Sequence, residues 1–241
     1  MRRLYEPEAY DGTADAGNFW RSTVEVPAPY PQIDGHVRCD FAIIGGGFTG
    51  LNAALHLARD HSANAVLLDA EEPGWGASGR NGGFVCLGGA KASPKTLARR
   101  HGQEEARLFA RAERAAVDHV AGLLQTEDID ADKHSKGETL VAHHPREWTR
   151  MAETAEEPHA LYGVDAELIP PEEMAARGMA ATGLHGAMTI PVGFAVNPLK
   201  YLLGLAKAAG NAGAALFGQS PVTSVALENG NHILRTPHGV V

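Results

Sequence analysis

The amino-acid sequence predicts an α/β protein that begins with a parallel βαβ unit and continues into a segment of mixed helices and strands. The first observation is an apolar run over residues 39–44, followed over residues 48–59 by apolar side chains at helical spacing. The second is another apolar run, residues 65–68, that ends at Asp69. Together these segments have the length of about 30 residues that a βαβ unit needs. The third is the loss of regular alternation beyond residue 135, which indicates an inserted second domain.

The remaining elements follow from caps and periodicity. Ser93 followed by Pro94 predicts the start of a long helix that runs to about Gln125. Its expected buried stripe has a spacing of three or four residues and consists of Phe109, Ala112, Ala116, Val120 and Leu123. We also expect helices over residues 145–161 and 198–209. Short strands are expected over residues 139–142, 166–169, 214–217, 222–227 and 232–235, with a turn at Asn229 and Gly230.

Composition excludes several classes of protein. The chain has 241 residues, 44% of them hydrophobic, and a net charge of -8, so we expect a globular protein that does not bind nucleic acid. No apolar run follows Arg2 and Arg3, which predicts neither a secretory signal nor a membrane anchor. Cys39 and Cys86 cannot form a disulfide framework, so a reducing, cytoplasmic location is expected. The twelve histidines lack paired metal-site spacing, and we expect no metal.

The strongest local motif lies between the first strand and the first helix. Gly45, Gly47 and Gly50 have the G-x-G-x-x-G spacing of a Rossmann-like dinucleotide-binding turn. The first glycine permits a tight turn, the second lets the backbone approach the pyrophosphate, and the third allows close packing of the helix on the strand. Asp69 ends the second strand, where a carboxylate can accept hydrogen bonds from ribose hydroxyls. This fingerprint alone does not separate NAD from FAD.

A glycine-rich segment selects between the two cofactors. GWGASGRNGGFV, from Gly74 to Val85, follows the second strand directly. Together with GGGFTG, it resembles the D-amino-acid oxidase, glycine oxidase and sarcosine oxidase family of FAD-dependent enzymes, and within it the gamma-glutamylputrescine oxidase-like branch. The resemblance continues through VAHHPREW (141–148), NPLKYLLGLAKAAGNAG (197–213) and SPVTSV (220–225). An NAD-dependent dehydrogenase is disfavoured because GASGRNGG has no role in that architecture.

The resemblance implies the residues that hold FAD. In the family, the segment matching Ala77 to Gly83 runs along the pyrophosphate and ribityl chain to the flavin ring. Ser78, Arg80 and Asn81 could donate hydrogen bonds there, and Val222 is implied to contact the adenine side. Arg80 and Asn81 are also the residues expected nearest the reactive edge of the ring. The expected cofactor-binding residues are Gly45, Gly47, Phe48, Thr49, Gly50, Asp69, Ala70, Gly76, Ala77, Ser78, Arg80, Asn81, Gly82, Gly83 and Val222.

The resemblance also implies a domain plan and a reaction. Residues 1–37 are expected to form an N-terminal arm. Residues 38–135 and 196–241 are expected to form an FAD-binding domain that is incomplete at its C-terminus, and residues 136–195 part of a substrate or cap domain. The implied activity is oxidation of a C–N bond of an amine or amino acid by hydride transfer to flavin N5. The catalytic residues stay unassigned.

Family members are considerably longer than this chain, so we expect an N-terminal fragment. Alone, it is expected to bind FAD weakly and to show no appreciable flavin reduction by amines. The alternative is a non-catalytic FAD-binding subunit that needs a partner chain. Self-association through an exposed strand edge is also expected.

Overall fold

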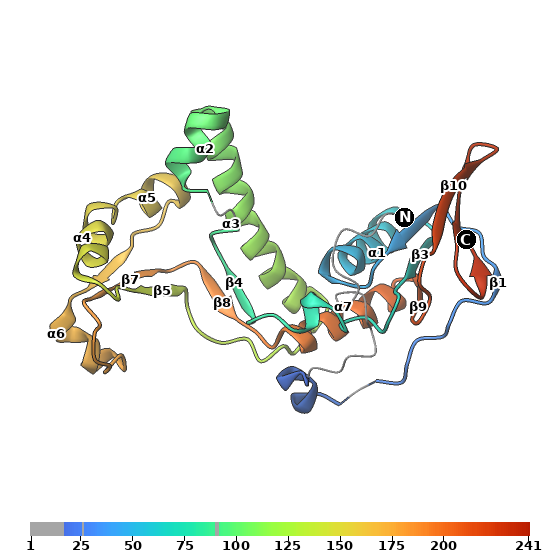
Figure 1. Ribbon diagram of the computed structural model, residues 1–241, viewed down its shortest axis with the longest axis horizontal. Coiled ribbons are helices and arrows are strands. Elements are labelled where there is room, and N and C mark those ends of the chain that lie inside the picture. The colour runs from blue at the N-terminus through green and yellow to red at the C-terminus, as the bar shows by residue number, and fades with distance from the viewer. Residues whose placement is uncertain (1–16, 26, 90–91) are drawn as a thin grey trace. The chain divides into compact units, whose positions relative to one another are not determined.

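The computed structural model describes residues 17–25, 27–89 and 92–241, and these fall into two compact units (Figure 1). The first unit contains the described residues up to Gly83 together with residues 124–132 and 197–241. The second unit contains residues 84–123 and 133–196. Residues 84–123 therefore group with the segment expected to be the cap rather than with the predicted FAD-binding domain. Part of the predicted arm, residues 1–16 and 26, lies outside the described residues.

A parallel sheet of three strands forms the centre of the first unit. Strand β3 (Ala65–Leu68) lies between β2 (Phe41–Ile44) and β9 (Ala215–Phe217). Phe41 pairs with Ala65 in the parallel register between β2 and β3. All four residues of β3 are buried, as expected for a strand covered on both faces. The predicted α/β, Rossmann-like βαβ fold is confirmed.

Two helices pack against each other within this unit. Helix α1 (Phe48–His61) buries Leu51, Ala54, Leu55 and Ala58, and α7 (Pro198–Asn211) buries the apolar face that includes Leu202 and Leu205. Asn197 caps α7, because its side-chain oxygen accepts a hydrogen bond of 3.2 Å from the Lys200 amide. Helix α1 also contacts β3. Val66 and Leu68 pack into a cluster on one face of this strand, and Ala65 and Leu67 point to the opposite face, which α1 covers.

A second, mixed sheet completes the first unit. Its strand order is β1 (Gly35–His36), β12 (Gly239–Val240), β11 (Asn231–Arg235) and β10 (Ser224–Glu228). The predicted turn between β10 and β11 is present, with positive φ angles of 51° at Asn229 and 82° at Gly230. Two consecutive residues with positive φ are typical of a tight hairpin. A buried cluster joins this sheet to β3 and consists of Ile33, Val66, Leu68, Leu234 and Val241.

The second unit combines antiparallel sheets with helices. Strand β4 (Phe84–Cys86) pairs with β8 (Gly193–Ala195), and β7 (Ala187–Ile190) lies between β5 (Glu138–Val141) and β6 (Glu167–Ile169). Its helical elements are α2 (Pro94–His101), most of α3 (Gln103–Thr126), α4 (Pro145–Glu153), α5 (Glu157–Tyr162), α6 (Pro171–Met174) and the 3₁₀ turn η4 (Ala175–Arg177).

Two predicted long helices are each divided in the structure. The predicted Ser93 cap is present, but the helix stops at Gly102, whose φ of +96° is incompatible with a continuous helix, and α3 starts afresh at Gln103. The predicted helix over 145–161 is similarly split into α4 and α5. Strands β4, β7 and β8 were not predicted, because they are short and pair with segments distant in sequence.

The predicted buried stripe of the long helix is also wrong in part. Phe109, Ala112 and Ala116 are exposed, Val120 is half-buried, and of the predicted stripe Leu123 is the buried member. The other buried residues of this helix are Ala106, Ala110, Val117 and Leu124. Alanines occupy several faces of this helix, so the apolar pattern fits more than one helical phase. Packing against the neighbouring elements selects the phase that is observed.

Within residues 17–25, 27–89 and 92–241, no helix is long and apolar enough to cross a membrane. The same part of the chain contains no cluster of three or more histidine, cysteine, aspartate or glutamate side chains arranged to hold a metal ion.

We predict that Leu67→Ala destabilises the first unit by about 2–5 kcal/mol, because Leu67 is fully buried in the central strand and its truncation leaves a cavity. Leu227→Ala is the control, since Leu227 is 68% exposed on β10. Urea unfolding followed by circular dichroism measures both effects. Equal midpoints for the two variants would show that β3 is not the centre of the core.

Candidate cofactor site

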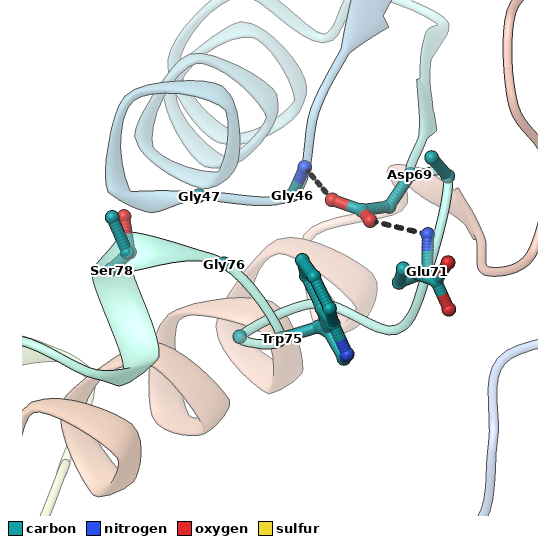
Figure 2. A pocket seen from close by; sticks show the side chains of 10 residues that line it. Gly46, Gly47, Asp69, Glu71, Trp75, Gly76 and Ser78 are labelled. Carbon is teal, nitrogen blue, oxygen red and sulfur yellow. Dashed lines mark hydrogen bonds between the residues drawn. The ribbon is translucent and has the colours of Figure 1, made fainter. Parts of the chain in front are cut away.

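A cavity of about 300 Å³ lies where β2 and β3 end and α1 begins (Figure 2). Ligands of open α/β sheets bind at the carboxyl ends of parallel strands, so this is the expected place for a dinucleotide. In Figure 2, Asp69 and Ser78 lie at opposite ends of the site, with Gly46 and Gly47 between them. The cavity is lined by Gly46, Gly47, Asp69, Ala70, Glu71, Gly74, Trp75, Gly76, Ala77 and Ser78.

The turn between β2 and α1 depends on two of the predicted glycines. Gly45 has a φ of +102°, and its amide donates a hydrogen bond of 2.8 Å to the Leu68 carbonyl at the end of β3. A Cβ on Gly50 would lie 2.0 Å from the Gly45 carbonyl oxygen and 3.3 Å from Cγ2 of Ile43 on β2. Gly50 therefore permits the close packing of α1 on the strand and the turn.

The N-terminus of α1 opens toward the cavity. Gly47 is the N-cap residue and provides no side-chain cap. A Cβ there would lie 2.9 Å from the Ser78 hydroxyl, which accepts a hydrogen bond of 3.1 Å from the Phe48 amide. Since a helix N-terminus carries free N–H groups and a partial positive charge, this end of the cavity suits a phosphate. The absence of a side chain at Gly47 leaves room for the Ser78 hydroxyl beside the helix N-terminus.

Asp69 connects the second strand to the glycine turn. Its carboxylate accepts one hydrogen bond of 2.5 Å from the Gly46 amide and another of 2.8 Å from the Glu71 amide. An ionised carboxylate has about four acceptor positions, so two stay available for ribose hydroxyls. The Asp69 backbone is also held, because its N–H donates to Phe217 and its carbonyl accepts from Ser220.

The glycine-rich segment folds back on itself through the 3₁₀ turn η3 (Ala77–Gly79). A Cβ on Gly79 would lie 2.0 Å from the Gly74 carbonyl oxygen, so only glycine allows this approach. Arg80 Nε donates to the Trp75 carbonyl at 2.5 Å, and its guanidinium carbon lies 4.7 Å from the centre of the Trp75 ring. This distance is within the range of a cation–π interaction.

Asn81 also bonds within the segment. Its Nδ2 donates to the Ser78 carbonyl at 2.8 Å, and its Oδ1 accepts from the Gly83 amide at 2.8 Å. The Arg80 and Asn81 side chains thus hold the shape of the segment and do not line the cavity, although both were expected to donate to the cofactor.

The structure brings some of the predicted residues to the cavity and leaves others away from it. Thr49 is exposed, the Phe48 ring lies 5.0 Å from that of Tyr201, and Val222 packs against the cluster around Ile33. Burial raises the pKa of Tyr201, so its phenol is held neutral. The predicted residues that line the cavity are Gly47, Asp69, Ala70, Gly76, Ala77 and Ser78.

Sequence reasoning missed four lining residues, namely Gly46, Glu71, Gly74 and Trp75. Gly46 could have been found from the run of three glycines. Its amide donates to Asp69 Oδ2, and a Cβ added at Gly46 would lie only 2.9 Å from the same oxygen, so this close approach requires glycine.

Comparison with known proteins identifies the family. The sequence profile of the FAD-dependent oxidoreductases called DAO matches residues 40–241. The chain belongs to this family. Gamma-glutamylputrescine oxidoreductase of Escherichia coli (strain K12) is 26% identical over 213 residues, which are 88% of this chain and 49% of that protein. A probable oxidoreductase, OrdL, of Rhizobium meliloti (strain 1021) is 29% identical over 227 residues, 93% of this chain and 52% of that protein.

Solved structures agree with this assignment. Glycine oxidase from Geobacillus kaustophilus has a TM-score of 0.67 at 26% identity and covers 84% of this chain, with 52% of its own chain matched. Glycine oxidase from Bacillus cereus has the same TM-score at 22% identity, which supports the fold. The DAO-family chain thus spans about half the length of the relatives that it matches. FAD is the cofactor of this family.

We predict that Asp69→Ala lowers the free energy of unfolding of the DAO-family chain without added flavin by about 1.5–3 kcal/mol, the usual contribution of hydrogen bonds to a charged group. The Gly46 and Glu71 amides lose their acceptor in this variant. Asp34→Ala is the control, because Asp34 is exposed in the same unit. Chemical denaturation measures both, and equal stability of the two variants would contradict the structural role of Asp69.

Proposed function

We propose that this chain holds FAD in the cavity between Asp69 and Ser78 and that its protein oxidises a C–N bond of a small amine or amino acid. The observation that carries the proposal is the joint placement of the glycine turn, the α1 N-terminus, Asp69 and the glycine-rich segment around one cavity. When bound, FAD supplies an acceptor for the hydride that leaves the carbon next to the amine nitrogen. The protein contributes binding and orientation.

Each element has a proposed role in binding. The Gly47 backbone and the α1 N-terminus hold the pyrophosphate, and Asp69 accepts hydrogen bonds from the ribose. Gly76 to Gly83 follow the cofactor beyond the pyrophosphate. There the glycines let the backbone approach the cofactor closely, while Arg80 and Asn81 keep the segment in shape. Val222 lies on the adenine side and contributes through its backbone.

The names of two relatives support the proposed substrate class. Gamma-glutamylputrescine oxidoreductase and glycine oxidase are named for an amine and an amino acid, respectively. Both substrates carry a C–N bond whose carbon can release a hydride, which supports the proposed reaction here.

A second candidate is an FAD-binding subunit that needs another chain for catalysis. The chain spans about half the length of its relatives, and β2 has no paired strand on its outer edge among the described residues. Phe41 and Ile44 on this strand are 48% and 54% exposed. An open edge with apolar side chains favours pairing with another strand, from a partner chain or a second copy.

We propose a reducing compartment, the cytoplasm, for this protein. The support is the presence of two cysteines, Cys39 and Cys86, both of which are free in the structure.

We predict that Gly47→Val abolishes FAD retention, because a branched side chain would displace the Ser78 hydroxyl from the α1 N-terminus, where the pyrophosphate is proposed to bind. Gly210→Val is the matched control, since a Cβ there meets no atom within 4 Å. Flavin absorbance of the purified proteins and FAD titration measure the effect. Equal flavin content in Gly47→Val and the parent would contradict the proposed site.

Flavin reduction distinguishes the two candidate functions. The FAD-loaded chain is mixed without oxygen with primary amines, gamma-glutamylated amines and amino acids while the flavin band is followed. We expect no appreciable bleaching from this 241-residue chain alone, since it spans only about half of its relatives. Bleaching on the order of 1 per second or faster would show that the chain itself oxidises amines. Bound FAD without bleaching supports the need for another chain or segment.

A further inference from the structure

We propose that the short 3₁₀ helix η2 (Phe19–Thr23) and its cap Asn18 are a positioning element that sets the Gly79–Gly83 backbone against the flavin half of the cofactor. The inference rests on the proposed function, because it assumes FAD in the cavity beside Asp69. It assigns a role in cofactor geometry to a segment that precedes the βαβ unit and does not line that cavity.

Two side chains of this element reach the glycine-rich segment. Asn18 Nδ2 donates a hydrogen bond of 2.9 Å to the Gly79 carbonyl, and Trp20 Nε1 donates one of 2.8 Å to the Asn81 carbonyl. Each bond joins residues that are 61 positions apart in the sequence. The two acceptors flank Arg80, so the donors hold the backbone on both sides of that residue.

The element is itself held at both ends. At its start, the Asn18 side-chain oxygen accepts from the Trp20 amide at 3.1 Å, which caps the helix. At its end, the Thr23 hydroxyl accepts a hydrogen bond of 2.8 Å from Asn197 Nδ2. Asn197 is only 3% exposed and is the N-cap of α7, so η2 is attached to a buried part of the first unit. A fixed element of this kind can set the position of a loop.

The geometry of the cavity explains why this position matters. Asp69 lies at one end and Ser78 at the other, with Gly46 and Gly47 between them (Figure 2). A dinucleotide with its ribose at Asp69 and its pyrophosphate at the α1 N-terminus continues past Ser78. The backbone that follows Ser78 therefore faces the flavin half. Gly82 and Gly83 have no side chains there, so contact with the cofactor depends on where the backbone is held.

Two substitutions isolate the proposed contacts. Asn18→Asp keeps an acceptor for the Trp20 amide but replaces the donor with a carboxylate that repels the Gly79 carbonyl. Trp20→Phe keeps an aromatic ring and removes the N–H that bonds to Asn81. Arg21→Ala is the matched control, because Arg21 is exposed on the same short helix. All variants are made in the full 241-residue chain.

FAD and ADP titrations with visible circular dichroism of the bound flavin form the test. A hydrogen bond contributes about 0.5–1.5 kcal/mol, so each test variant should bind FAD roughly two- to tenfold more weakly than the parent. ADP lacks the flavin half, so the affinity of each test variant for ADP should differ from that of the parent by less than about twofold. The visible dichroism of the flavin should change in both test variants and stay unchanged in Arg21→Ala.

Three results would overturn the inference. Unchanged FAD affinity and dichroism in both test variants would show that the contacts do not position the cofactor. An equal loss of FAD and ADP affinity would show that η2 only supports the fold. A parent chain that binds neither FAD nor ADP would refute the proposed function, and the inference with it, whereas the first two results leave the proposed function intact.

Discussion

The candidate site depends on the hydrogen bonds that the Asp69 carboxylate accepts from the Gly46 and Glu71 amides. They join the end of β3 to the turn that starts α1, and so place the helix N-terminus beside the strand. The Gly45 amide adds a backbone bond to Leu68 in the same place. Because β3 is buried on both faces, the carboxylate extends from a part of the molecule that cannot move easily. The charge and the helix terminus are thus arranged before any ligand binds.

Glycine-rich segments perform two different tasks in this site. Gly50 and Gly79 each lie so close to a backbone carbonyl that a Cβ would be only 2.0 Å from it, so they determine the shape of the chain. Gly47 instead lets the Ser78 hydroxyl approach the helix N-terminus. The charged and amide side chains nearby, Arg80 and Asn81, bond within their own segment. The cavity therefore offers much backbone to a ligand, and its polar lining side chains are those of Asp69, Glu71 and Ser78.

The structure shows contacts made by a segment that lies outside the family match. The DAO profile covers residues 40–241 and assigns the chain to FAD-dependent oxidoreductases. Residues 18–23 precede that match, yet they bond to the glycine-rich segment and to the cap of α7. The contribution of a segment outside the family match is visible in its contacts and not in its sequence. These contacts are the basis of the positioning role that we propose for η2.

Local sequence was sufficient where neighbouring residues determine the conformation. The βαβ unit, the Ser93 cap and the Asn229–Gly230 turn all depend on short stretches of sequence. The first two elements of the site, Gly45–Gly50 and Asp69, lie within one such unit. The breaks in the predicted helices fall at two local signals that were not used, Gly102 and Pro158. The phase of α3 and strands β4, β7 and β8, in contrast, were not predictable from local sequence. Each depends on packing or pairing with residues far along the chain. The hydrogen-bond partners of Arg80, Asn81 and Trp20 were also not predictable from local sequence. A side chain's hydrogen bonds depend on which groups the folded backbone brings within reach.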